Sequence, residues 1–118
     1  MTRILVTGGY SRFATELKKI KSNFKFTYLN KTQLNILNYN SILKAIKKYR
    51  PRKILHLASL SRPMDAHERN ITKSINLNII GTANLVNACS KCKIQIIYFS
   101  TSYIYPGKKG AYKETDSL

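Results

Sequence analysis

Short apolar runs alternate along the chain with segments in which apolar residues recur at helical spacing. Residues 4–6, 25–29, 54–58 and 94–99 have the length and composition of strands. The run at 54–58 is nearly continuous, which suits a parallel sheet covered on both faces. Strand and helix alternate in order, so the pattern predicts an α/β fold with a parallel sheet in the strand order 3-2-1-4.

Three helices are expected between these strands. The first has helical spacing at Phe13, Leu17 and Ile20, with Arg12 in its first turn. The second can be capped by Asn38 or Asn40 and ends before Pro51. The third covers about residues 69–91, and its predicted buried side carries Ile71, Ile75, Ile79, Ala83, Val86 and Ala88. Gly81 interrupts that pattern at a cost of about 1 kcal/mol against alanine, so close packing is expected there.

The first strand leads directly into a glycine turn and then a helix. In this arrangement, backbone N–H groups and a helix N-terminus can face a phosphate. The spacing Gly-x-x-Gly-x-x-Gly would place glycines at 8, 11 and 14, whereas the chain has Gly8, Ser11 and Ala14. Arg12 could add a cation beside a phosphate or be solvated. The turn predicts a nucleotide site, with a ligand-free strand-to-helix turn as the alternative.

Asn30 and Lys31 fall at the carboxyl end of the second predicted strand, where α/β nucleotide sites contact the ribose. An acid at this place would accept hydrogen bonds from the ribose hydroxyls of NAD. Lys31 could instead meet a 2′-phosphate, so the pair leans towards NADP. A polar turn without a ligand is an equal alternative.

The chain is strongly basic for a single domain of 118 residues. Its net charge is +16, from 21 Lys and Arg against 5 Asp and Glu, which suits a nucleotide and also favours nucleic acid or anionic membrane. Coding bias is an alternative explanation of the charge, because Lys, Asn, Ile and Tyr are all abundant, as expected from an A/T-rich genome. The basic residues are scattered, and the densest group ends a predicted helix: Lys44, Lys47, Lys48, Arg50, Arg52 and Lys53. Solvated faces are therefore favoured over a nucleic-acid groove.

Cys89 and Cys92 form a C-x-x-C near the end of the long predicted helix, where the helix dipole opposes a thiolate. His56 and His67 lack the spacing of further zinc ligands, so ordinary packing and no metal are expected. No apolar stretch is long enough to span a bilayer and no signal-peptide pattern is present. A cytoplasmic protein without a membrane partner is therefore expected.

Four further patterns occur in register: Val6-Thr-Gly8, His56-Leu-Ala58, Asn78-Ile-Ile-Gly-Thr82, and Ser100-Thr-Ser-Tyr-Ile-Tyr-Pro-Gly107 with Tyr112-Lys-Glu-Thr-Asp116. With them the chain resembles the extended short-chain dehydrogenase/reductases, and within these the dTDP-4-dehydrorhamnose reductase family. The resemblance implies a Rossmann-type NAD(P)-binding domain over residues 1–118, without the later strands and the sugar-binding domain. It also implies hydride transfer from NAD(P)H to a 4-keto sugar nucleotide.

The resemblance also implies roles for individual residues. Cofactor contacts fall on the glycine turn, the end of the second strand, the segment after it and the loop after the third strand: Gly8, Ser11, Arg12 and Phe13; Asn30 and Lys31; Asn35 and Ile36; Ala58, Ser59, Leu60 and Ser61. Thr101 matches the catalytic Ser/Thr, and Ser102 and Tyr103 match substrate-pocket positions. Without the resemblance, Thr101 is interpreted as a strand-end hydroxyl that caps backbone groups.

The proton donor of that family is a Tyr-x-x-x-Lys pair on a helix, and no predicted helix here carries one. Tyr49 with Lys53 and Tyr105 with Lys109 have the spacing, but both segments contain proline and lie at loops. We therefore expect the 118 residues to be inactive alone, as part of a longer or split enzyme. We also expect the fourth strand to be an exposed edge, open to self-association or a partner chain.

Two other interpretations stay open at this stage. The chain could be a fragment of a nucleotide-sugar epimerase or dehydratase, because these enzymes share the same cofactor domain. It could also be a non-catalytic module that binds NAD(P) or nucleic acid, or a functionless remnant.

Overall fold

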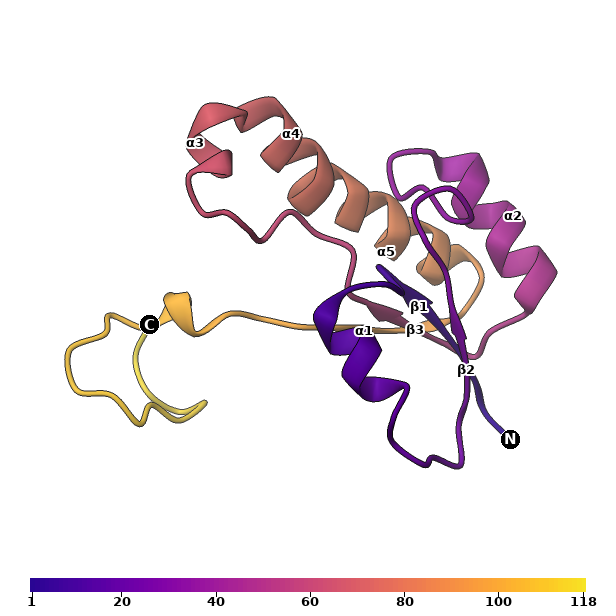
Figure 1. The fold of residues 1–118 in the computed structure, drawn as a ribbon, viewed down its shortest axis with the longest axis horizontal. Helices are drawn as coiled ribbons and strands as arrows, with labels where there is room; N and C mark the ends of the chain where they lie inside the picture. Colours follow the sequence, from indigo (N-terminus) through magenta and orange to yellow (C-terminus); the bar gives the residue numbers. More distant parts are fainter.

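A computed structural model describes the backbone of residues 1–118 and every side chain except that of Ser102. In this described part, a four-stranded parallel sheet lies at the centre of the fold (Figure 1). Its strands are β1 (Arg3–Thr7), β2 (Lys25–Tyr28), β3 (Lys53–His56) and β4 (Gln95–Tyr98). The helical segments are α1 (Arg12–Leu17), α2 (Tyr39–Tyr49), α3 (Ala66–Arg69), α4 (Ile71–Ile75), the π-helical η1 (Asn76–Ile80), α5 (Gly81–Lys91) and the 3₁₀ turn η2 (Ser102–Ile104).

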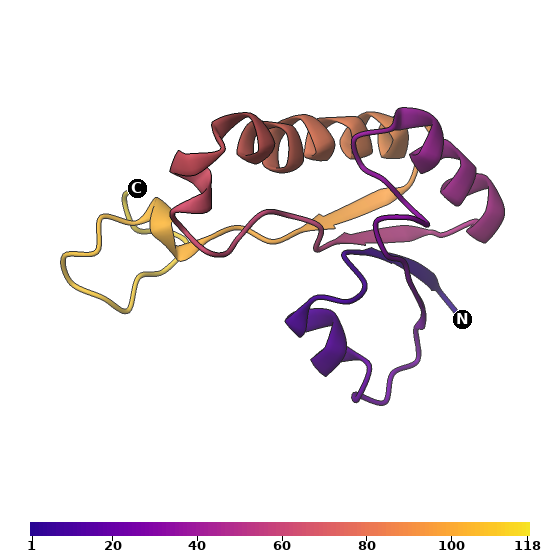
Figure 2. The ribbon, with the colours of Figure 1, turned by 45° about the horizontal axis from the view of Figure 1, so that its top comes forward.

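Helices cover the two faces of the sheet unequally, as Figure 2 shows: α2 and the long helix that ends in α5 lie on one face, and α1 lies on the other. The larger core lies under α2 and α5, and its buried residues include Leu5, Leu29, Ile42, Ile54 and Leu85. The smaller core, on the side of α1, is formed by Ile4, Val6 and Leu55. Parallel strands with flanking helices confirm the predicted Rossmann-type fold class.

The predicted strand order 3-2-1-4 is wrong, because the observed order is β2-β1-β3-β4. Residues 54–56 of β3 are all buried, which suits a central strand, whereas β2 begins with an exposed Lys25 and is only half-buried beyond it. After β2 the chain runs back across β1, so a right-handed crossover places α2 on the face opposite α1. β4 lies at the other edge of the sheet, as expected.

The second helix and its ends follow the sequence closely. The side-chain oxygen of Asn38 accepts a hydrogen bond from the backbone N–H of Ser41 at 3.1 Å, which caps α2. Arg50 ends the helix in the left-handed conformation, with φ of 46°, and Pro51 follows. The predicted capping and termination of this helix are therefore confirmed.

The long predicted helix is present as α4, η1 and α5, but its predicted buried side is largely wrong. Ile71, Ile75, Ile79, Ala83 and Val86 are exposed, and Ala88 alone of the six predicted residues is buried. The buried residues of α5 are instead Gly81, Leu85, Ala88 and Cys89. The predicted stripe is exposed both before the π-helical segment η1 and after it, so the prediction fails because α5 turns another side to the core.

Gly81 has the close contact that the sequence predicts. A Cβ atom at this position would lie 2.6 Å from Cδ1 of Ile36. The glycine therefore lets the start of α5 approach the segment after β2, and alanine would need Ile36 to move.

Candidate functional site

A cleft of about 980 Å³ opens at the edge of the sheet where β1, β3 and β4 end. In open parallel α/β sheets, ligands bind outside the carboxyl ends of the strands. The walls come from the start of α1, the loop after β3, one side of η1 and α5, and the segment after β4. The lining residues are Ser11, Arg12, Phe13, His56, Leu57, Ala58, Ser59, Leu60, Ser61, Arg62, Asn78, Thr82, Tyr98, Phe99, Ser100, Thr101 and Ile104.

The glycine turn after β1 packs tightly against both neighbouring strands. Gly8 has φ of 61°, and a Cβ atom there would lie 2.8 Å from the backbone nitrogen of Ala58. A Cβ atom at Gly9 would lie 2.7 Å from the backbone nitrogen of Leu29. Both positions therefore require glycine, the first for conformation and both for space.

Ser11, which replaces a glycine of the usual spacing, caps the helix that follows. Its hydroxyl oxygen accepts a hydrogen bond from the backbone N–H of Ala14 at 3.2 Å. The helix is short, with six residues, and Arg12 is exposed at its start on the cleft wall. The Phe13 ring packs on that of Phe99, with 4.9 Å between centroids, which joins α1 to the end of β4.

A buried hydrogen-bond network lies at the floor of the cleft. The Oγ1 atom of Thr7 accepts hydrogen bonds from the backbone N–H groups of Leu57 (3.1 Å) and Ala58 (3.2 Å). With both lone pairs used, the Thr7 hydroxyl donates its proton to Nδ1 of His56, 2.8 Å away. Nε2 of His56 therefore carries the ring proton and donates it to Oγ1 of Thr82 at 3.0 Å.

Burial determines the charge state of His56. Burial lowers the pKa of His56 to about 4, so the ring is neutral near pH 7. A neutral ring has one donor and one acceptor nitrogen, which is the arrangement that the two threonines require. The positive charge along the cleft therefore comes from Arg12 and Arg62, and none of the described lining residues is Asp or Glu.

Asn78, in the π-helical segment, holds the loop that follows β3. Its Oδ1 atom accepts from the backbone N–H of Leu60 at 2.8 Å, and its Nδ2 donates to the carbonyl oxygen of Leu60 at 2.9 Å. Both backbone groups of one loop residue are thereby fixed. The π-helical turn lies where a helix side chain must reach the cleft, a place where such turns are frequent.

The predicted catalytic and substrate residues lie beyond the end of β4. Thr101 lines the cleft, and its Oγ1 atom accepts a hydrogen bond from the backbone N–H of Tyr103 at 3.2 Å. Tyr103 is exposed and lines a neighbouring hollow with Ser61, Arg62, Pro63 and Met64. The predicted role of Ser102 falls on a side chain outside the described part of the structure.

The cleft brings together eight of the predicted site residues and leaves others outside its lining. Ser11, Arg12, Phe13, Ala58, Ser59, Leu60, Ser61 and Thr101 line it, and Gly8 lies in the turn behind. Asn30 is held in a turn by reciprocal 2.9 Å hydrogen bonds with Gln33, and Lys31 is exposed beside it. Oδ1 of Asn35 accepts from the N–H of Leu37, and Ile36 is buried in the core. Their roles at a cofactor stay predictions.

Several lining residues have contacts that the sequence did not predict. His56, Asn78 and Thr82 form the contacts described above, and Tyr98 and Phe99 form an aromatic wall. Two signals were present: His56, Asn78 and Thr82 belong to the patterns quoted above, and His56 is a polar residue in an otherwise apolar strand, which requires buried partners. Its partners lie 49 and 26 residues away, so the sequence alone could not name them.

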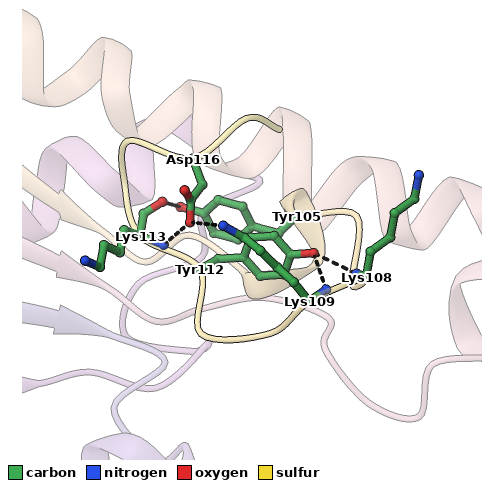
Figure 3. Close-up of polar contacts among 6 residues, drawn as sticks. All are labelled: Tyr105, Lys108, Lys109, Tyr112, Lys113 and Asp116. Carbon is green, nitrogen blue, oxygen red and sulfur yellow. Dashed lines mark hydrogen bonds and ion pairs between the residues drawn. The ribbon is translucent and has the colours of Figure 1, made fainter.

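Contacts among its own residues hold together the segment from Tyr105 to Asp116 (Figure 3). The rings of Tyr105 and Tyr112 stack with 4.9 Å between centroids, and the hydroxyl of Tyr112 accepts from the backbone N–H groups of Lys108 and Lys109. Nζ of Lys109 lies 3.2 Å from Oδ2 of Asp116. Tyr105 and Lys109 therefore lie in a loop, as expected. Tyr49 ends α2 and Lys53 begins β3, so that pair shares no helix either.

The two cysteines lie at the far end of α5. Cys89 is buried, and burial raises the pKa of its thiol to about 11, while Cys92 is exposed. This environment keeps the Cys89 thiol protonated and fits its predicted packing role. Among the described residues, no group of three His, Cys, Asp or Glu is placed to hold a metal, and no helix is long and apolar enough to cross a membrane.

Comparisons with known proteins identify the family. A curated relative, dTDP-4-dehydrorhamnose reductase from Aggregatibacter actinomycetemcomitans, is 28% identical over 122 residues, which are 100% of this chain and 41% of the relative. Methionine adenosyltransferase 2 subunit beta from Pongo abelii is 26% identical over 97% of this chain and 36% of that protein. The chain thus spans about two fifths of the length of these relatives.

Solved structures share the fold. The dTDP-4-dehydrorhamnose reductase from Clostridium acetobutylicum aligns with a TM-score of 0.83 and 23% identity, over 99% of this chain and 42% of that one. The enzyme of the same name from Bacillus anthracis, solved in complex with NADP, aligns with a TM-score of 0.81 and 22% identity, over 92% of this chain and 40% of that one. The family model described as the RmlD substrate binding domain matches residues 1–118, and the chain therefore belongs to that family.

Proposed function

We propose that this domain binds NAD(P) in the cleft and forms the cofactor-binding portion of a sugar-nucleotide reductase. The observation that carries the proposal is the cleft itself, beside a turn that requires glycine and lined by two guanidinium groups without a carboxylate. Such a lining suits a ligand that carries phosphates. A relative of the same family acts as a dTDP-4-dehydrorhamnose reductase, and a structural neighbour was solved with NADP.

The fit of a dinucleotide follows from the distribution of polar and apolar walls. The guanidinium of Arg12 would pair with the pyrophosphate, next to the glycine turn. Phe13 and Phe99 would provide an apolar wall for a ring, and the hydroxyls of Ser59 and Ser61 would reach polar groups at the nicotinamide end. When bound, the reduced nicotinamide supplies the hydride.

We propose that Thr101 acts on the substrate. Its oxygen accepts a hydrogen bond from the backbone N–H of Tyr103, so its hydroxyl proton remains available to donate to a substrate carbonyl oxygen. A hydride added to the carbonyl carbon leaves an alkoxide, which then needs a proton. We propose that further chain supplies this proton through a tyrosine and a lysine, and that it or a partner chain pairs along β4, where the sheet has an edge.

Cofactor binding is tested by titrating the purified chain with NADPH and following nicotinamide fluorescence. Arg12→Glu should weaken binding at least roughly tenfold, because a charge-assisted hydrogen bond is lost and a repulsion is added. Lys108→Glu makes the same charge change on the loop after the cleft and should leave the affinity unchanged. Equal weakening by both variants would mean that only net charge matters. An unsaturable titration of the parent chain would refute the proposal.

Cofactor choice and turnover are tested separately. Lys31→Ala should weaken NADPH binding more than NADH binding if this exposed side chain meets the 2′-phosphate; an equal effect would contradict that role. With NADPH and a dTDP-4-keto sugar, the 118 residues should show no turnover, because no positioned acid protonates the alkoxide. Sustained NADPH oxidation with formation of the reduced sugar would contradict the need for further chain.

A further inference from the structure

The edge of the sheet opposite the cleft, where the strands begin, gathers basic residues from distant parts of the sequence. Arg3 is the register partner of Lys25, and Lys53 lies opposite Ile4 on the other side of β1. The backbone N–H of Arg52 donates to the carbonyl of Arg3 at 2.9 Å. Neighbouring strands lie about 4.8 Å apart and register partners share a face, so Arg3 and Lys25 lie side by side on one face, while Lys53 points to the other face of the same edge. The chain's N-terminus lies at the same edge (Figure 1).

Two more cations lie at this edge. Arg50 lies between the end of α2 and β3, and its carbonyl accepts from Nε of Arg3 at 2.8 Å. Lys93 lies just before β4, whose Gln95 N–H donates to the carbonyl of Arg52 at 3.3 Å. We call this set the basic edge: Arg3, Lys25, Arg50, Arg52, Lys53 and Lys93. All are exposed except Lys53, which is half-buried.

The positive charge of the basic edge is not neutralised within the described structure. The chain has five acidic residues, and none lies at the starts of the strands: Glu16, Asp65, Glu68, Glu114 and Asp116. The three ion pairs among the described residues are Glu16–Lys19, Asp65–Arg69 and Asp116–Lys109. The cations of the basic edge therefore repel one another, and this surface favours binding of a polyanion.

Aromatic rings flank the cations. Phe24, directly before β2, is 48% exposed, and its ring lies edge-on to that of Phe26, with 6.2 Å between centroids. At the end of α2, Nζ of Lys48 lies 5.1 Å from the ring centre of the half-buried Tyr49. Cations that track a backbone, together with exposed rings on which bases stack, are the features of sites for single-stranded nucleic acid.

We propose that the basic edge is a binding surface for single-stranded nucleic acid. The sequence alone favours solvated faces because these cations are scattered over residues 3–93, whereas the parallel sheet gathers them at one edge, with Arg3 and Lys25 on one face and Lys53 on the other. The surface lies at the edge opposite the cleft, so a nucleic acid bound there would not displace a dinucleotide. Phosphates would contact the Lys and Arg side chains, and a base would stack on Phe24.

The test is the anisotropy of a labelled oligothymidylate of about twenty nucleotides, titrated with the full chain. The paired variant Lys25→Glu/Arg52→Glu should weaken binding at least tenfold. If two phosphate contacts are lost, the slope of log K against log salt should become shallower by roughly 1.4. The variant Lys108→Glu/Lys113→Glu makes the same charge change on the loop after the cleft and should retain more affinity and the parent slope.

Two further variants keep the test decisive. Lys25→Gln/Arg52→Gln should weaken binding in the same direction and serves if the glutamate pair unfolds, as judged by circular dichroism. Phe24→Ala should weaken binding at least fivefold with an unchanged salt slope, because stacking carries no charge. Equal losses in the edge and loop variants would overturn the proposal. So would release of the oligonucleotide by saturating NADPH, or tighter binding of anionic vesicles or an acidic polypeptide than of the oligonucleotide.

Discussion

The two faces of the sheet are built very differently. Under α2 and α5, Leu5, Ile54 and Leu85 are fully buried, and the strands and both helices interlock in one core. On the other face, α1 buries only Ala14 of its six residues, and the sheet next to β4 is left open. There Ile97 is 36% exposed and Phe99 is 49% exposed. We call these the two-helix face and the one-helix face.

The two faces contribute differently to the molecule: the two-helix face stabilises the fold, and the one-helix face leaves the cleft accessible. Burial of apolar surface contributes about 25 cal/mol per Å², so the two-helix face provides most of the stabilisation. Leu17 of the short α1 packs against the smaller core of Ile4, Val6 and Leu55, whereas Arg12 and Phe13 at the start of the helix line the cleft. The one-helix face therefore leaves the cleft accessible to a ligand. The strand ends that form the floor of the cleft belong to the two-helix face.

The largest expected effect tests the two faces with one residue type. Ile54→Ala removes a fully buried side chain from the two-helix face and should lower the free energy of unfolding by about 3 kcal/mol. Ile97→Ala, in the neighbouring strand and on the one-helix face, should cost about 1 kcal/mol or less because its side chain already meets water. Urea unfolding followed by circular dichroism measures both. Equal losses would mean that the one-helix face is covered in solution.

The next effect concerns His56, the buried ring on the two-helix face. Its pKa is about 4 when folded and about 6.5 when unfolded, so between these values the unfolded state binds more protons. Stability should therefore fall as the pH falls, by about 2 kcal/mol between pH 7.5 and 5. Urea unfolding at the two pH values measures the loss.

Two variants test whether His56 causes that pH dependence. His56→Gln removes the buried imidazole and should flatten the dependence, although the variant itself is less stable. His67→Gln removes the half-buried imidazole of α3 and should leave the dependence in place. A dependence that survives His56→Gln would contradict the assignment.

The sequence predicts local features of both faces but not which face a segment covers. The strands, the glycine turn and the capping of α2 by an asparagine (Asn38 or Asn40) depend on neighbouring residues, and all were predicted. The strand order failed because it depends on where the chain crosses after β2. The available signal for the order was the contrast between Lys25 at the start of β2, which suits an edge strand, and the apolar residues 54–55 of β3, which suit a central strand. The π-helical turn of η1 had no such signal.

The residues of the cleft also divide into those whose position can be predicted from the sequence and those whose position cannot. Ser59, Ser61 and Thr101 lie in the segments that follow β3 and β4, so their position at the carboxyl edge follows from topology once the strands are found. Asn78 and Thr82 reach the cleft from a helix, and their partners lie 18 and 26 residues away. Such contacts depend on the rotation of the helix, which the π-helical turn changes.

A smaller effect is expected at the closest contact of the two-helix face. Gly81→Ala should gain about 1 kcal/mol of helix propensity but lose more to overpacking against Ile36, for a net loss of about 1 kcal/mol. Ile36→Val removes Cδ1, the nearer of the two Ile36 atoms that the new Cβ would meet, and leaves the contact at the Cγ1 position, 2.8 Å away. The double variant should therefore be more stable than the sum of the single losses predicts, by roughly 0.5 kcal/mol or more. Additive losses would mean that the backbone, and not Ile36, absorbs the strain.

The smallest effect belongs to the exposed ion pair between Glu16 of α1 and Lys19, which follows the end of that helix. Nζ of Lys19 lies 2.8 Å from Oε1 of Glu16, and both side chains are about two-thirds exposed. Lys19→Ala should lower the free energy of unfolding by about 0.3 kcal/mol at low salt, and the loss should shrink near 1 M salt as screening weakens the pair. Lys21→Ala removes the same charge from the loop after α1 and controls for net charge. A salt-independent loss confined to Lys19→Ala would show that the lysine stem packs on the helix. Apolar contact would then stabilise α1 more than its ion pair, as it does on the two-helix face.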